Sequence, residues 1–282
     1  MKPSAPDPVS TLARAPRAER VFRCAFGLCL TPCAVGAAAL FMPELHVTPG
    51  LANALAFAGA TLLPILALAI AATADVTLLA ALAVAALSVA LLLALVFLRH
   101  APVAAMLVVD SALVGFAWSV GTSIGRRVQH ASHLLPACVV AASADLVSLL
   151  SPEGPSHAVA QSDRALSVLA VWFPVPGTLA LAPALGVGDL LFMALVFGVA
   201  VVHHLPYVRT VSLAAFGTAV AGGIAARLGV AVPALVPISA AILLGLPQVR
   251  HVRPADRKAA TWAMSLAGMV VVAVVARRFL SR

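Results

Sequence analysis

Three aspartates lie inside long apolar stretches of the sequence, where carboxylates are costly. The chain has ten acidic residues, most of them in a polar tail or in loops, but Asp110, Asp145 and Asp189 are exceptions. A carboxylate near the middle of a bilayer costs about 2.5–3.5 kcal/mol on insertion scales, so each of the three is a candidate functional residue. The alternative is a structural carboxyl at a helix end or bonded across helices. We favour that alternative for Asp110, which no recognisable motif surrounds, and for Asp75, at the junction of two apolar runs.

Two facing carboxylates can hydrolyse a peptide bond without a metal if they share one proton. The ionised carboxylate takes a proton from water as the water attacks the scissile carbonyl, and the protonated one donates to the developing oxyanion. We predict Asp145 and Asp189 as this catalytic pair, without assigning the base, because such a pair titrates as a unit. The four cysteines lack CxxC spacing, and the adjacent His203 and His204 diverge on a helix, so we predict neither a metal nor a cofactor.

The neighbours of Asp189 and a later proline-containing element favour a site for an extended peptide. Asp189 closes the segment Leu185–Asp189, whose two glycines allow another backbone to approach closely. Pro233-Ala234-Leu235 opens a later apolar run, and prolines at a first helical turn leave nearby carbonyls unpaired. The residues predicted to bind substrate are Gly186, Gly188, Pro233, Ala234 and Leu235.

The composition places these residues in a membrane protein. Of the 282 residues, 62% are hydrophobic and 10% charged, and the mean hydropathy is +1.07. Soluble domains contain about a quarter charged residues. At about 20 residues per span, the chain accommodates eight or nine helices and no large domain outside the membrane. Because aromatic residues are few and Tyr207 is the single tyrosine, a β-barrel is disfavoured. We predict an all-α, polytopic membrane helix bundle of about nine transmembrane helices.

The apolar runs divide the chain into four predicted segments. A polar, basic tail occupies 1–20, and an N-terminal four-helix membrane region occupies 21–130. The catalytic membrane region covers 131–248, and a basic loop with an additional helix covers 249–282. The predicted runs are 21–42, 51–73, 76–98, 102–124, 134–151, 184–202, 209–229, 233–247 and 261–280.

The net charge of +8 comes from 18 basic residues against 10 acidic ones. The basic residues gather at helix ends and in short loops, which indicates the positive-inside orientation of a membrane protein rather than a nucleic-acid partner. If the tail is cytoplasmic, Arg126–Arg127, Arg209 and Arg250–Lys258 share its side, and the loop of Glu153 and Asp163 lies outside.

A short segment, Leu166–Phe173, is too short to span a membrane. A transmembrane substrate must unwind before hydrolysis, and its freed polar groups then need new partners. The β-rich composition of this segment predicts a strand that could pair with such a substrate. The alternative is an interfacial segment anchored by Trp172 and Phe173.

Three motifs in a fixed order resemble those of a known family. Asp145 in DLVSLLSPEGP, Asp189 in LGVGD and Pro233-Ala234-Leu235 in VPALVPIS are similar to the signatures of the presenilin and signal peptide peptidase family of intramembrane aspartyl proteases. The resemblance covers roughly 134–247 and is closest to the presenilin branch. It implies a presenilin-like fold in the C-terminal half, with both aspartates catalytic, and pairing of substrate with the segment ahead of GxGD.

The sequence departs from the family pattern in three respects. The family usually has tyrosine directly before the first aspartate, where this chain has Ala144. The family places five helices before that aspartate and ends after the Pro-Ala-Leu helix, whereas this sequence predicts four before it and another run at 261–280. The predicted orientation is that of signal peptide peptidase rather than presenilin.

We therefore expect an aspartic endopeptidase in a lipid bilayer that cleaves single-span membrane proteins or remnant signal peptides, with no assigned partner subunits. Arginine exceeds lysine and alanine is abundant, which indicates a GC-rich bacterial genome and hence a cytoplasmic membrane. Three alternatives remain open. They are a prepilin-peptidase-like membrane protease, a proton-coupled transporter with Asp110, Asp145 and Asp189 as a relay, and an inactive homologue that binds membrane helices.

Overall fold

The structure is a computed structural model that describes residues 47–280 apart from 75, 98–102, 152–153, 179 and 229–231, together with Ala34 and Ala38. The predicted tail at 1–20, the apolar run at 21–42 apart from Ala34 and Ala38, Asp75 and Glu153 lie outside the described residues.

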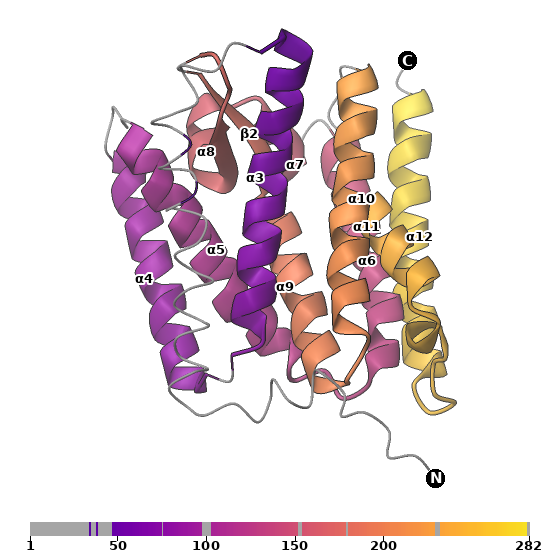
Figure 1. Cartoon of the computed structure of the whole chain (residues 1–282). Coiled ribbons are helices and arrows are strands. Elements are labelled where there is room, and N and C mark those ends of the chain that lie inside the picture. Colours follow the sequence, from indigo (N-terminus) through magenta and orange to yellow (C-terminus); the bar gives the residue numbers. More distant parts are fainter. Residues whose placement is uncertain are drawn as a thin grey trace. The chain divides into compact units, whose positions relative to one another are not determined.

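The described chain is mainly helical, with one pair of strands (Figure 1). The elements are α3 (Pro49–Ala72), α4 (Leu78–Phe97), α5 (Val103–Gly125), η2 (Ala131–His133), α6 (Leu134–Leu150), α7 (Pro155–Ala160), α8 (Asp163–Leu169), β1 (Ala170–Pro174), β2 (Leu181–Gly186), α9 (Val187–Val202), α10 (Tyr207–Leu228), α11 (Leu235–Gly245), η3 (Pro247–Arg250) and α12 (Arg257–Leu280).

Helices occur at all of the predicted apolar runs that the structure describes. Six helices within the described ranges are long and apolar enough to cross a membrane, so the prediction of a mainly helical membrane protein is confirmed. Two runs predicted as spans form shorter helices, namely α9 with 16 residues and α11 with 11. At 1.5 Å per residue they extend about 24 and 17 Å, less than the ~30 Å of a hydrocarbon core. The described residues therefore do not reach the predicted count of nine full-length spans.

A second difference from the all-α prediction is the two-stranded sheet of β1 and β2. The connection from Val175 to Ala180 is too short for a parallel crossover, so the strands form an antiparallel hairpin. Proline at 174 and 176 cannot supply the N–H groups that a helix needs. Gly177 turns the chain with a φ of 76°, a conformation that residues with a Cβ rarely adopt.

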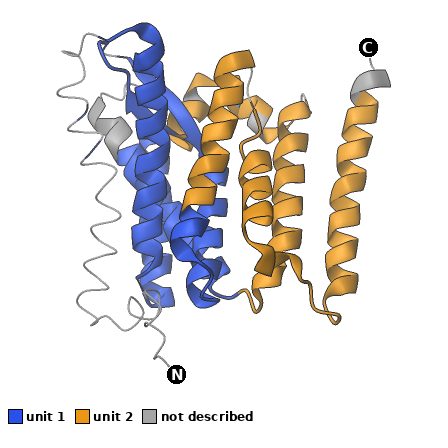
Figure 2. Ribbon diagram, turned by 45° about the vertical axis from the view of Figure 1, so that its right-hand side comes forward, with its two compact units in different colours: residues 1–127, 171–211 blue, residues 128–170, 212–282 orange. Residues whose placement is uncertain are grey.

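The chain forms two compact units, which Figure 2 colours separately. Unit 1 comprises the residues up to Arg127 and Val171–Val211, and unit 2 comprises Val128–Ala170 and Ser212–Arg282. Part of the predicted catalytic region at 131–248, the stretch Val171–Val211, thus packs with the helices that precede Arg127.

Small residues set the helix packing inside unit 1. α5 packs against both α4 and α9, and α3 also packs on α9. A Cβ added at Gly121 would lie 2.6 Å from the backbone oxygen of Leu191, and one at Gly125 only 2.2 Å from that of Leu195. These glycines therefore allow the backbones of α5 and α9 to approach closely, as small residues do between membrane helices.

Side chains from other elements complete the C-terminal end of α3. The last four carbonyls of a helix have no partner within it. Here the hydroxyl of Tyr207 donates to the Ala69 carbonyl, and the indole of Trp118 donates to that of Ala71 at 2.9 Å. Arg126 donates to the Ala72 carbonyl at 2.9 Å, and the Thr73 N–H donates to that of Ile70. All four carbonyls thus have donors, and a cation lies at the negative end of the helix dipole.

In unit 2, α6 packs against α11 and α12. At the start of α6, His133 Nε2 lies 3.2 Å from Asp256 Oδ2, and Arg253 lies 2.8 Å from the ring nitrogen of His130. Cys138 in α6 is fully buried, and Cys24, Cys29 and Cys33 lie outside the described residues.

The close approach of α5 and α9 predicts that Gly121→Ala destabilises the protein. The added methyl group would meet the backbone of α9, and such overpacking costs about 1–3 kcal/mol. Gly268→Ala in α12 is the matched control, because no described atom lies within 4 Å of its added Cβ. Thermal unfolding in detergent should show a lower midpoint for Gly121→Ala only. Equal midpoints for the two variants would contradict the packing described here.

Candidate functional site

Asp145, the first predicted catalytic residue, contacts the Pro-Ala-Leu element within unit 2. The backbone N–H of Leu235 donates to Oδ2 of Asp145 at 3.0 Å, although the two residues are 90 positions apart. Asp145 lies in the C-terminal half of α6, which packs against α11, and its side chain is half-buried. Two motifs that were predicted to belong to one site are therefore neighbours in the fold.

The first turn of α11 leaves one backbone donor for Asp145. Its N–H groups are not all needed by the helix: Val236 donates to Pro233 and Ile238 donates to Ala234, while Pro237 has no N–H. The N–H of Leu235, the first helical residue, is therefore available for the Asp145 carboxylate. The Asp145 carboxylate also faces the positive end of the helix dipole of α11.

α10 supports the same turn from within unit 2. A Cβ added at Gly217 would lie 2.5 Å from the Cα of Ile238 and 2.9 Å from the Pro237 oxygen. Glycine therefore lets the backbone of α10 touch the beginning of α11. Further along, the buried Ser239 lies beside the Cys138 thiol of α6.

Asp189, the second predicted catalytic residue, lies in unit 1 in the first turn of α9. β2 ends at Gly186 and α9 begins at the next residue. The Gly186 N–H donates to Oδ2 of Asp189 at 3.2 Å, so this carboxylate closes the N-terminus of its own helix. A Cβ added at Gly188 would meet no described atom within 4 Å. The GxGD segment thus presents a half-buried carboxylate beside open space.

The two predicted catalytic aspartates belong to different units, Asp145 to unit 2 and Asp189 to unit 1. Each unit is described by itself, so the pairing of the two carboxylates stays a prediction. Ala144, in the place of the family tyrosine, is exposed on α6. The single tyrosine, Tyr207, is engaged at the end of α3.

Asp110 has a partner that the sequence did not reveal. It is fully buried in α5, and its Oδ1 accepts the backbone N–H of Trp172 in β1 at 3.0 Å. The two residues are 62 positions apart, and a hydrogen bond to a backbone N–H leaves no pattern in the side-chain sequence.

The predicted strand at Leu166–Phe173 is only half correct. Its first four residues complete α8, and the strand begins at Ala170 and extends to Pro174. Those four residues are helical because the Ser162 hydroxyl accepts the Ala165 N–H and caps α8, and Asp163 lies in the first turn of that helix. β2 overlaps the first three residues of the run at 184–202 that was predicted to be helical, and it pairs with β1.

Two other patterns carry no site in the described residues. Gly121-Thr122-Ser123-Ile124-Gly125 has the Gly-x-Ser-x-Gly spacing of serine hydrolases, but it lies within α5 rather than at a strand-to-helix turn. His204 lies two residues after the end of α9 and has a positive φ of 50°, and the Leu205 N–H donates to the Ala200 carbonyl. Within the described ranges, no group of three or more His, Cys, Asp or Glu side chains could hold a metal ion.

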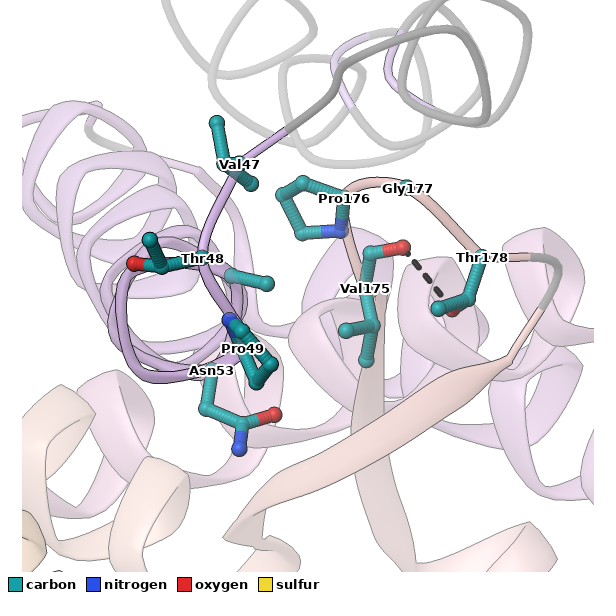
Figure 3. Close-up of a pocket in the computed structure, with 9 residues that line it drawn as sticks. Val47, Thr48, Pro49, Asn53, Val175, Pro176, Gly177 and Thr178 are labelled. Carbon is teal, nitrogen blue, oxygen red and sulfur yellow. Dashed lines mark hydrogen bonds between the residues drawn. The ribbon is translucent and has the colours of Figure 1, made fainter.

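A pocket of about 630 Å³ lies in unit 1 between the start of α3 and the connection of the hairpin (Figure 3). Thr48, Pro49 and Asn53 line one side, and Val175–Thr178 line the other. The Thr178 hydroxyl donates to the Val175 carbonyl at 3.0 Å and holds the connection in place. No lining residue is charged, and the pocket lies at the opposite end of β2 from Asp189.

Comparison of the chain with protein-family models, curated proteins and solved structures finds no match. The resemblance to presenilins therefore rests on the three motifs alone.

The contact between Asp145 and Leu235 predicts a local change in hydrogen exchange. Asp145→Ala removes the acceptor, so the Leu235 amide should exchange faster, whereas Asp145→Asn keeps an acceptor oxygen and should preserve slow exchange. Mass spectrometry of peptides that cover 232–240 measures the difference. Unchanged exchange in Asp145→Ala would show that this carboxylate does not hold the start of α11.

Proposed function

We propose that the chain is an intramembrane aspartyl protease that hydrolyses peptide bonds in transmembrane segments or remnant signal peptides. One observation carries the proposal, namely the hydrogen bond from Leu235 to Asp145. This bond links Asp145 of the first motif to Leu235 of the third. Asp145 lies on α6, which belongs to a helical stretch long and apolar enough to span a membrane. The proposal includes a presenilin-like arrangement of the C-terminal half and, from the arginine- and alanine-rich composition, a bacterial cytoplasmic membrane.

In the proposed reaction Asp145 and Asp189 share one proton and activate a water molecule between them. One carboxylate accepts a proton from the water as its oxygen bonds to the scissile carbonyl carbon. The other donates its proton to the oxyanion, and the C–N bond then breaks as the leaving amine is protonated. The backbone N–H of Leu235 fixes the orientation of the Asp145 carboxylate, and that of Gly186 fixes Asp189.

In this proposal, the edge of β2 that faces away from β1 would supply backbone partners for an unwound substrate. The Val175 N–H donates to the Ala180 carbonyl at 2.9 Å. Continuing the antiparallel alternation pairs Phe173 with Ala182 and points the backbone groups of Leu181 and Leu185 away from β1. A substrate strand added at this edge would run toward Gly186 and the open space at Gly188.

Pro183 limits pairing at that edge. With residues 182 and 184 facing β1, the nitrogen of Pro183 points outward, where it lacks a hydrogen atom. Proline at an edge discourages indiscriminate strand pairing. It also predicts that an added substrate strand makes one hydrogen bond fewer at this position.

The acid/base pair is tested with purified protein in liposomes and a tagged single-span substrate. Asp145→Asn and Asp189→Asn should each lower cleavage at least a hundred-fold, on the order expected for loss of an acid/base group. Gel and mass-spectrometric detection of both products measures the rate. Asp163→Asn is the matched control, because Asp163 is an exposed carboxylate outside both motifs.

Several outcomes decide between this function and the alternatives. Cleavage that survives either substitution at Asp145 or Asp189 excludes the pair. Cleavage confined to bonds outside the membrane segment favours a prepilin-peptidase-like activity. Proton flux in the same liposomes, without cleavage of a panel of single-span substrates, favours a transporter. Binding of those substrates without cleavage or flux favours an inactive homologue.

Gly188→Ala tests whether a substrate backbone uses the space beside Asp189. The added methyl group meets no described atom within 4 Å, so the thermal midpoint should be unchanged or slightly higher. Cleavage should fall about ten-fold or more if the methyl group displaces the substrate backbone by a fraction of an ångström. Gly223→Ala, which is equally unobstructed in α10, should keep wild-type cleavage. Equal rates for the two variants would show that substrate does not approach Gly188.

A further inference from the structure

Among the described residues, Asp110 is the fully buried carboxylate, and the proposed reaction does not use it. It lies in α5 with no exposed surface, and its Oδ1 accepts the Trp172 N–H. Its second oxygen has no hydrogen-bond partner among the described residues. One hydrogen bond to a neutral N–H does not offset the transfer of a carboxylate into an apolar helix. This hydrogen bond alone therefore does not explain why a carboxyl group is buried here.

The bond to Asp110 falls on one edge of the hairpin. The pairing of Val175 with Ala180 directs Phe173 and Val171 toward β2. The intervening residue, Trp172, then directs its N–H away from β2, which agrees with its bond to Asp110. Asp110 of α5 thus occupies a backbone donor on the outer edge of β1, and this contact lies in the interior of unit 1.

A second contact holds the same strand against α3. The ring of Phe173 packs on Ala56 and Ala60, and the partly buried Ala182 and Ala184 of β2 complete this cluster. A Cβ added at Gly59 would lie 2.4 Å from the ring, so the absence of a side chain there makes room for it. α5 therefore holds β1 through the backbone N–H of Trp172, and α3 holds it through the ring of Phe173.

We propose that Asp110 is a positioning residue that holds β1, and with it the hairpin, so that an extended membrane substrate on β2 is aligned with Asp189. The inference rests on the proposed protease function. β2 pairs with β1 and leads directly into α9, so a substrate on a fixed β2 meets Asp189 in one register.

The test uses the full chain in liposomes with a single-span substrate and compares Asp110→Leu with Asp110→Asn. The asparagine variant keeps an oxygen acceptor for Trp172, and the leucine variant does not. We expect Asp110→Asn to cleave at the wild-type bond. Asp110→Leu should spread cleavage over neighbouring bonds and raise KM on the order of three- to ten-fold, the size expected for one lost hydrogen bond. Mass spectrometry of the products locates each cleaved bond.

A second pair of variants removes the same bond from the side of β1. Trp172→Pro eliminates the N–H at a position that faces away from β2, whereas Trp172→Phe keeps both the N–H and an aromatic ring. Trp172→Pro should reproduce the shifted cleavage of Asp110→Leu, and Trp172→Phe should not. This pair keeps the test decisive if Asp110→Leu fails to fold.

Hydrogen exchange of the peptide that covers 170–175 gives a readout that needs no cleavage. Exchange should be faster in Asp110→Leu and unchanged in Asp110→Asn. Unchanged exchange in Asp110→Leu, or faster exchange with wild-type cleavage positions and KM, overturns the positioning role while leaving the protease intact. Loss of cleavage in Asp110→Asn also overturns it, because the residue would then act in the chemistry. Absence of cleavage by the wild type across substrates rejects the proposed function itself, and the positioning role with it.

Discussion

In each of three apolar segments, an aspartate side chain accepts a backbone N–H. Asp110 bonds a strand residue, Asp145 bonds the first residue of α11, and Asp189 bonds the residue that precedes α9. In a bilayer no water is present to accept such donors, and an unpaired N–H is costly. The carboxylates therefore satisfy backbone donors at the strand pair and at the starts of two helices inside a mainly helical membrane protein.

The same constraint governs the carbonyl groups. The end of α3 exposes its last carbonyls, and Trp118, Arg126 and Tyr207 supply the donors. The short helices α9 and α11 begin directly at the motifs, and each has an aspartate at its positive end. Broken helices whose N-termini face polar groups are a common way to build sites within membranes. In the proposed protease, the interruptions that the aspartates stabilise are also the places where an extended substrate can find backbone partners.

Local sequence patterns predicted the helices well and the breaks poorly. Every predicted apolar run that the structure describes contains a helix, because the apolar length of a span is a property of consecutive residues. The strand prediction was wrong at Leu166–Leu169, where the helix cap from Ser162 outweighs the β-propensity of the residues. The helix prediction was wrong at 184–186, because the end of a strand that pairs with β1 is as apolar as the helix that follows. Asp110 was recognised as costly, but its partner in β1 was not.

The sequence by itself determined that the protein is an apolar, mainly helical membrane protein, and it singled out Asp145, Asp189 and the Pro-Ala-Leu element as candidates for chemistry. Composition and motif order suffice for this, because both are read from side chains along the chain. Only the tertiary structure decided what each carboxylate contacts. The partners of Asp110 and Asp145 are backbone N–H groups 62 and 90 positions away, and every residue except proline carries such a group. No sequence pattern can therefore single out the N–H that packing brings to the carboxylate.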